Sequence, residues 1–140
     1  MESPQEEKKG VIHYGAALIK CISTTPLPRL SIIIGGSYGA GNYAMSGRGL
    51  NPNFLWAWPN AQVAVMGHAQ ASGVLKQLNS QEKPTETYND LQGQWQQKSQ
   101  ALYATARLFD DGIIHPDNTR HYLTLALQII ATQKQGKTTP

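Results

Sequence analysis

A glycine-rich stretch follows the most apolar run of this 140-residue chain and contains the groups best suited to bind a charged oxygen. It reads Gly35-Gly36-Ser37-Tyr38-Gly39-Ala40-Gly41-Asn42-Tyr43-Ala44-Met45. A turn of this kind between a strand and a helix exposes backbone N–H groups at the positive end of the helix dipole. The pattern predicts a site for an anion or for an oxygen that gains negative charge. A tight turn without a ligand fits the same pattern, and both interpretations stay open.

The distribution of carboxylates bears on the chemistry of this turn. All nine acidic residues lie outside the segment from Lys8 to Gln81, which contains the turn. A site within that segment has no carboxylate of its own as a general base or metal ligand. Chemistry on an anion there would therefore depend on backbone amides and helix ends. A buried segment that excludes charge explains the gap equally well.

Three ligand-binding motifs can be compared with the turn. A P-loop does not fit, because no Lys-Ser or Lys-Thr pair follows the glycines. The spacing Gly39-x-Gly41-x-x-Ala44 matches a dinucleotide-binding fingerprint. The acidic residue expected about 20 positions later is missing, so NAD binding is the weaker alternative. An oxyanion hole of crotonase type needs only two amides aimed at one oxygen, and it fits the acid-free segment best.

Metal chemistry has little support in the sequence. The four histidines are His13, His68, His115 and His121, and none belongs to an H-E-x-x-H pattern. We therefore expect each of them to be a surface or hydrogen-bonded histidine, and we expect no metal site in this chain.

Five further residues favour structural roles. The pair Asp110-Asp111 is more typical of a turn or strand end than of a paired-carboxylate site. Trp56 and Trp58 alternate along a predicted strand and favour a core or interface position over stacking on nucleic-acid bases. The single cysteine, Cys21, cannot form an internal disulfide, and we expect it to be a small buried side chain in a reduced compartment.

Composition narrows the classes of partner. Net charge is +3, and the basic residues are scattered rather than clustered, so we expect no nucleic-acid partner. The longest apolar runs are too short to cross a bilayer, which takes roughly 20 residues. Acidic residues at positions 2, 6 and 7 do not fit a signal or transit peptide. Only 15% of residues are charged, which suggests that part of the surface meets a partner.

Apolar periodicity and the positions of Gly and Pro predict an α/β fold in which strands alternate with helices. Strand 30–34 is predicted to be buried on both faces. The whole series is a polar start over 1–10, helix 11–22, strand 30–34, a turn and short helix over 37–46, strands 54–58 and 62–66, helix 68–77, a long helix over 88–102, a strand or turn over 108–114, and a last helix that opens at 116–117.

Two separated blocks of this sequence carry a resemblance to a known family. The first comprises Ile34 to Met45, Gly47-Arg48, Phe54-Leu55-Trp56, Trp58-Pro59-Asn60-Ala61 and Val65-Met66-Gly67, and the second comprises Ala106 to Ile114, Pro116 and Thr119-Arg120. Both resemble the carboxyltransferase (β) subunit of biotin-dependent acyl-CoA carboxylases. The wording Gly-Ser-Tyr-Gly-Ala-Gly-Asn-Tyr looks most like the methylcrotonyl-CoA carboxylase branch.

The resemblance implies a crotonase-like fold and a partial, C-terminal carboxyltransferase-like domain over residues 9–133. Residues 1–8 form a non-matching start and residues 134–140 a polar tail. In the family, two amides of this domain stabilise the biotin enolate while CO2 passes from carboxybiotin to an enoyl-CoA. Carried over, these are the amides of Ala40 and Gly41, and Gly39 shapes the cofactor-binding turn.

The same resemblance implies the partners. These are an acyl-CoA substrate, an α subunit that carries biotin, and other β subunits in a homo-oligomer. The resemblance also implies that the protein is located in the mitochondrial matrix of a eukaryote or in the cytoplasm of a bacterium. The resemblance covers only the second domain of the family, and family positions such as His68 and His115 carry unusual residues. We therefore expect no activity from the chain alone. The alternative is an inactive fragment or paralogue that only associates with full-length subunits.

Overall fold

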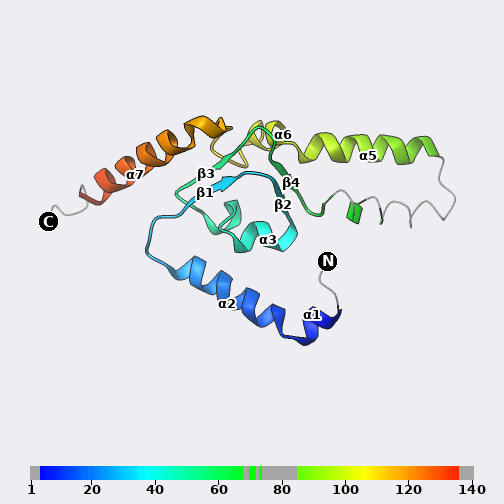
Figure 1. Ribbon diagram of the computed structural model, residues 1–140, viewed down its shortest axis with the longest axis horizontal. Helices are drawn as coiled ribbons and strands as arrows, with labels where there is room; N and C mark the ends of the chain where they lie inside the picture. The colour runs from blue at the N-terminus through cyan, green and yellow to red at the C-terminus, as the bar shows by residue number, and fades with distance from the viewer. Residues whose placement is uncertain (1–3, 68–69, 72, 74–84, 136–140) are drawn as a thin grey trace.

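The computed structural model describes residues 4–67, 70–71, 73 and 85–135 (Figure 1). Among these residues no helix has both the length and the apolar character needed to span a membrane. The elements in chain order are α1 (Pro4–Lys8), α2 (Val11–Thr24), β1 (Leu30–Ile33), β2 (Gly36–Tyr38), α3 (Gly39–Ala44), the 3-10 helix η1 (Arg48–Leu50), β3 (Phe54–Ala57), β4 (Gln62–Ala64), α5 (Thr85–Ser99), α6 (Ala101–Thr105), the 3-10 helix η2 (Pro116–Asn118) and α7 (Thr119–Gln135).

β3 is the central strand of the sheet. β1 lies parallel to it on one side, with Ile33 opposite Ala57. On the other side Ala57 forms a parallel bridge with Ile113, and the Ile114 amide donates a 2.9 Å hydrogen bond to the Ala57 carbonyl oxygen. One neighbour of β3 therefore precedes it in the sequence, and the other follows it by more than 50 residues.

β2 and β4 extend this arrangement toward the glycine-rich turn. They pair in parallel, with Gly36 opposite Gln62. The Gln62 amide donates a 3.0 Å hydrogen bond to the Gly35 carbonyl oxygen, which links this pair to the end of β1. Parallel strands joined by helices confirm the α/β class predicted from the sequence.

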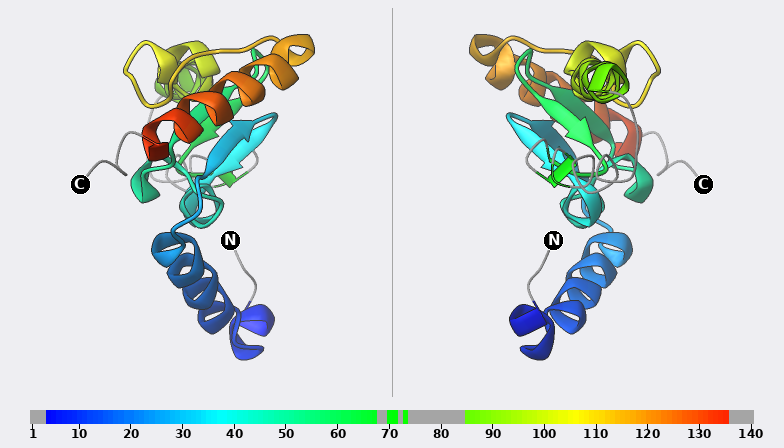
Figure 2. Two further views of the ribbon diagram at one scale, coloured as in Figure 1. Left: turned by 90° about the vertical axis from the view of Figure 1, so that its left-hand side faces the viewer. Right: turned by 90° about the vertical axis from the view of Figure 1, so that its right-hand side faces the viewer.

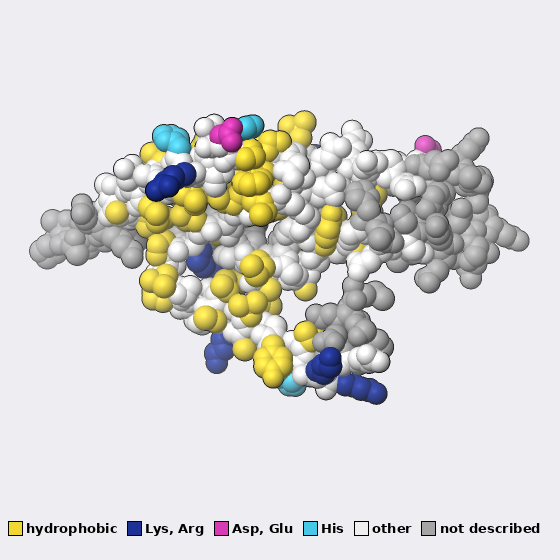
Figure 3. Space-filling model, viewed as in Figure 1, with side chains coloured by type: hydrophobic (Ala, Val, Ile, Leu, Met, Phe, Trp, Pro, Cys, Tyr) yellow, Lys and Arg dark blue, Asp and Glu magenta, His cyan; other side chains and the backbone are white. Residues whose placement is uncertain are grey.

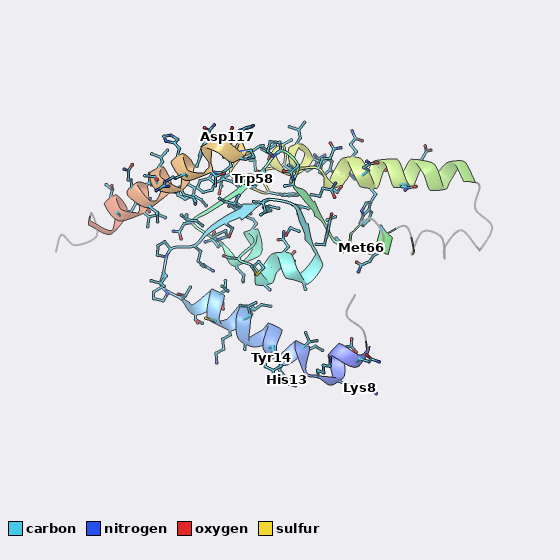
Figure 4. The ribbon with its side chains drawn as sticks, in the orientation of Figure 1. Lys8, His13, Tyr14, Trp58, Met66 and Asp117 are labelled. Carbon is cyan, nitrogen blue, oxygen red and sulfur yellow. The ribbon has the colours of Figure 1, made fainter. Side chains whose placement is uncertain are left out.

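Helices cover the two faces of β3 with separate apolar clusters. On one face Trp56 and Ile114 pack with Ala126 of α7, and on the other Ala57 and Ala61 pack with Ala101 of α6. Trp58 donates a 3.1 Å hydrogen bond from its indole Nε1 to Thr119 Oγ1 at the start of α7 (Figure 4). Trp56 of β3 is buried in the core, and Trp58, which follows β3, is partly buried against the same cluster, as the sequence favoured.

β1 and α2 are less buried than the sequence predicted. All four residues of β1 are only half-buried, and Ile34 is 57% exposed, so the expectation of a strand buried on both faces is wrong. α2 confirms the predicted helix, yet none of its residues is buried, and Cys21 is exposed rather than buried. The cause is visible in Figure 2, where α2 extends away from the sheet instead of lying across it.

The predicted long helix over 88–102 is divided. α5 ends at Ser99 and α6 begins at Ala101, because Gln100 adopts an extended backbone and bridges Gln62 of β4. Gly93 lies inside α5 and does not interrupt it. The polar start contains a short helix, α1. The predicted helix 68–77 lies mostly outside the described residues.

Candidate functional site: the turn between β2 and α3

The glycine-rich turn joins β2 directly to α3. Tyr38, the last residue of β2, is extended, and Gly39 then takes a positive φ of 57°. A Cβ atom built on Gly39 would lie 3.0 Å from the carbonyl oxygen of Val65. Glycine is therefore required here both by its backbone conformation and by the closeness of the loop after β4.

The amides of Ala40 and Gly41 point to the chemistry of this turn. Both residues lie in the first turn of α3, where N–H groups have no acceptor inside a helix. Within the described part of the chain no side chain caps this end of α3, and no carbonyl oxygen accepts a hydrogen bond from either amide. Ala40 and Gly41 are also exposed. Two adjacent N–H groups at this end of α3 therefore have no acceptor among the described residues.

Side chains hold the turn in place from both strands. Asn42 Nδ2 donates a 2.9 Å hydrogen bond to Ser37 Oγ, which ties α3 to β2. Tyr38 donates from its hydroxyl to Gln62 Oε1 at 2.7 Å, which ties β2 to β4. A Cβ atom on Gly36 would lie 2.5 Å from the Tyr38 ring, so the ring needs a glycine beneath it. Sequence reasoning did not find these anchors, because each joins residues whose contact depends on the strand register.

Exposed apolar side chains lie next to the turn. Tyr43 and Met45 follow its donors and are 56% and 74% exposed, and Val65, whose carbonyl oxygen faces Gly39, is 77% exposed. Hydrophobic side chains spread over the face shown in Figure 3, from the sheet down to α2. The surroundings of the two donors therefore suit contact with another polypeptide.

The histidines do not join the turn. His13 is exposed on α2, where Figure 4 labels it beside Tyr14. His115 Nδ1 lies 3.3 Å from Asp117 Oδ2 at the surface. The His121 ring packs edge-on against the ring of Tyr122. His68 lies outside the described residues. Within the described ranges no three His, Cys, Asp or Glu side chains gather as a metal site would require.

The acidic pair organises a loop, as the sequence favoured. Asp110 is buried, and its Oδ1 accepts hydrogen bonds from Thr105 Oγ1 at 2.8 Å and from the Gly112 amide at 3.0 Å. Asp111 forms an ion pair with Arg48. The two carboxylates therefore face different partners and do not act as a pair.

Comparison with known proteins shows the family of this chain. The carboxyl transferase domain family matches the chain over residues 1–140. This chain belongs to that family. The beta1 subunit of the Mycobacterium tuberculosis biotin-dependent 3-methylcrotonyl-coenzyme A carboxylase is 40% identical in an alignment of 136 positions that covers 89% of this chain and 26% of that subunit. The Dictyostelium discoideum mitochondrial methylcrotonoyl-CoA carboxylase beta chain is 38% identical over 91% of this chain and 24% of its own.

Solved carboxyltransferase structures match the fold. The Pseudomonas aeruginosa geranyl-CoA carboxylase beta subunit superposes with a TM-score of 0.81 at 45% identity, over 94% of this chain and 26% of its own. The transcarboxylase 12S subunit, solved as a hexamer with methylmalonyl-coenzyme A, gives 0.81 at 28% identity, over 94% of this chain and 25% of its own. The crotonase-like carboxyltransferase fold is confirmed as a partial domain, and this carboxyl transferase chain spans about a quarter of these relatives.

Proposed function

We propose that this chain is part of the carboxyltransferase component of a methylcrotonyl-CoA carboxylase-like enzyme. It would contribute to the transfer of CO2 from carboxybiotin to an enoyl-CoA and would be inactive without the rest of the subunit. The observation that carries the proposal is the pair of amides at Ala40 and Gly41, two exposed residues whose N–H groups have no acceptor in the described chain. Similarity to carboxylase beta subunits at about 40% identity supports this reaction class.

The proposed role of the turn is electrostatic. Ala40 and Gly41 donate hydrogen bonds to an oxygen that gains negative charge, and Gly39 fixes their direction through its positive φ. Donors that are already oriented cost no reorganisation when the charge develops, and one such donor is typically worth about 3 kcal/mol in the transition state. The hydrogen bond from Asn42 to Ser37 keeps these donors in place.

Biotin fits the turn by the chemistry of its donors. Its ureido oxygen is an acceptor, and the turn offers two exposed donors with no carboxylate between Lys8 and Gln81 to repel it. When bound, the group supplies the carboxyl to be transferred and a nitrogen that can take up the substrate proton. The residues of this chain bind and orient that oxygen, and no side chain of the acid-free segment has to act as a base.

We propose a biotin-carrying α subunit, other β subunits and an acyl-CoA as partners. The exposed side chains of Tyr43, Met45 and Val65 beside the turn support contact with another polypeptide. Relatives from Dictyostelium discoideum and Arabidopsis thaliana are named as mitochondrial. We accordingly propose the mitochondrial matrix for a eukaryotic source and the cytoplasm for a bacterial one.

The experiment is reconstitution of a carboxylase around this chain. The P. aeruginosa geranyl-CoA carboxylase beta subunit would be truncated to remove the stretch that matches this chain, then combined with its biotin-carrying subunit and the chain itself. We expect carboxylation of an enoyl-CoA above the level of the mixture without the chain. Ala40→Pro, which removes one amide donor, should lower kcat about 10²- to 10³-fold, whereas Ala40→Ser, which keeps the donor, should retain activity.

A second candidate is an inactive chain that only associates with full-length subunits. The observation that favours it is the presence of residues that are unusual for the family, such as His115. This alternative predicts co-elution with the truncated subunit, no carboxylation above the control, and no difference between Ala40→Pro and Ala40→Ser. That set of results would replace the catalytic proposal.

A further inference from the structure

Tyr38 stands directly before the two amide donors of the turn. It is the last residue of β2 and has an extended backbone, and Gly39 then turns the chain with a φ of 57°. Ala40 follows at once, so a change in the direction of Tyr38 reaches the donors through a single residue. Among the described residues no side chain caps this end of α3. The direction of the two N–H groups therefore depends on how Tyr38 is held.

The ring of Tyr38 lies against backbone from both strands of the pair. A Cβ atom built on Gly36, two residues earlier in β2, would lie 2.5 Å from the ring. One built on Gly67, after β4, would lie 3.5 Å from it. The first distance is shorter than atoms tolerate, so the ring occupies space that only glycine leaves open. The half-buried ring is thus confined to a narrow slot.

The hydroxyl of Tyr38 is held as well. It donates a 2.7 Å hydrogen bond to Gln62 Oε1, which is the usual length for an O–H donor. The Gln62 amide donates to the Gly35 carbonyl oxygen at 3.0 Å, and the backbone of Gln62 bridges Gln100 on its other side. The acceptor of the Tyr38 hydroxyl therefore belongs to a residue whose backbone is fixed on both edges of β4.

The two side-chain anchors of the turn do different work. The bond from Asn42 to Ser37 joins α3 to its own preceding strand, so β2 and α3 move together as one unit. The bond from Tyr38 to Gln62 reaches from that unit to β4. It is this second bond that sets the unit, and the donors within it, relative to the rest of the sheet.

We propose that Tyr38 and Gln62 form a positioning pair that aims the amides of Ala40 and Gly41 at the oxygen they bind. The inference rests on the proposed function of the turn and adds two residues to it. Neither side chain is assigned a contact with the oxygen, because Tyr38 acts through Gly39. Dipoles stabilise a developing charge best when they are oriented beforehand, so a looser turn should weaken catalysis even though both donors remain.

The kinetic test uses the reconstituted carboxylase described above, with geranyl-CoA as the substrate. Tyr38→Phe keeps the ring and removes the hydroxyl, and Gln62→Met keeps the side-chain length and removes the acceptor. Each should lower kcat about tenfold and leave KM within about twofold, since the donors are misdirected and not lost. The double variant should be no slower than either single one, because both remove the same bond. Tyr122→Phe, which removes a hydroxyl on α7, is the matched control and should keep kcat.

A second measurement needs neither biotin nor activity. NMR relaxation of the full 140-residue chain gives order parameters for single amides. Those of Ala40 and Gly41 should be about 0.85 in the unmodified chain and fall below about 0.6 in Tyr38→Phe and Gln62→Met. Gln62→Glu retains an oxygen acceptor and should restore the rigid values. The amide of Ala126, in the core cluster with α7, should stay rigid in every variant.

Several results would overturn the inference. These are turn amides that are already mobile in the unmodified chain, rigid turn amides in both Tyr38→Phe and Gln62→Met, loosening of Ala126 to the same extent, and a rise in KM with kcat unchanged. Gln62→Met leaves the Tyr38 ring in its slot and decides the matter if Tyr38→Phe does not fold. Order parameters that respond as expected, without carboxylation by the reconstituted enzyme, would support the positioning pair and count against the proposed function alone.

Discussion

Arg48 Nη2 lies 2.8 Å from Asp111 Oδ1, and this ion pair joins two residues that are 63 positions apart in the sequence. Arg48 also donates from Nε to the Phe109 carbonyl oxygen at 3.1 Å. The second carboxylate oxygen of Asp111 accepts a 2.7 Å hydrogen bond from the Leu55 amide. Asp111 thereby connects η1, the central strand β3 and the loop that leads to α7.

The two members of this ion pair should contribute unequally to stability. Asp111→Ala leaves the amide of Leu55 without its acceptor, and Leu55 is only 3% exposed, so we expect a loss of about 1–3 kcal/mol in the free energy of unfolding. Arg48→Ala removes a partly exposed partner and should cost about 0–1 kcal/mol. Urea denaturation of both variants measures the difference, and equal losses would show that the Leu55 contact contributes little.

Glycine should be needed at one position of the turn and dispensable at another. Gly39→Ala places a side chain on a backbone with positive φ and brings its Cβ to 3.0 Å from the Val65 carbonyl oxygen. We expect a loss of about 1–2 kcal/mol in the free energy of unfolding. Gly41→Ala is the control, because its Cβ meets open space within α3 and should stabilise the helix by up to about 1 kcal/mol. Thermal melts compare them, and a Gly39→Ala variant at least as stable as Gly41→Ala would contradict the geometry.

Trp56 should be the most costly side chain of the sheet to remove. It is buried, stacks on Phe54 with ring centroids 5.1 Å apart, and meets the edge of Tyr122 from α7 at 6.0 Å. Trp56→Ala should cost about 3–5 kcal/mol in the free energy of unfolding, by lost burial and an internal cavity. Trp56→Phe keeps an aromatic ring and should cost clearly less. Denaturation with guanidinium chloride distinguishes the two, and a cost below about 1 kcal/mol for Trp56→Ala would rule out this packing.

Cys21 should react as an exposed thiol in the folded chain. α2 has no buried residue, so nothing described shields the Sγ atom. We expect a maleimide to modify Cys21 in the native chain within a few-fold of the rate in denaturant. Mass spectrometry over time provides the measurement. Protection by tenfold or more in the isolated, monomeric chain would mean that α2 folds back onto the sheet.

Local patterns predicted much of the fold, because the forces that decide those elements act between near neighbours in sequence. The helix over 11–22 follows from apolar spacing and the prolines after it, and the strand over 54–58 follows from its aromatic residues. The turn at Gly39 was predicted from glycine spacing alone. The division of the long helix at Gln100 was not, since its cause is a bridge to Gln62, which lies far away in sequence.

Burial was predicted less well, for a physical reason. An apolar residue such as Ile32 or Cys21 indicates that some surface should cover it, but a sequence does not indicate whether that surface belongs to the same chain. The glycines of the candidate site predicted exposed backbone N–H groups, and the family resemblance implied that the two donors are those of Ala40 and Gly41. Their availability depends on the absence of an acceptor from distant elements, and the anchors Asn42 and Tyr38 depend on strand pairing.

The central position of β3 has a consequence for synthesis of this polypeptide. One neighbour of β3, the strand over 30–33, leaves the ribosome before it, while the other, around Ile113, follows only after α5 and α6. At the usual synthesis rate of ~5–20 residues per second, several seconds pass before the second neighbour of β3 is synthesised. During that interval the indole of Trp56 lacks its α7 cover, so a nascent chain is most in need of chaperone protection there.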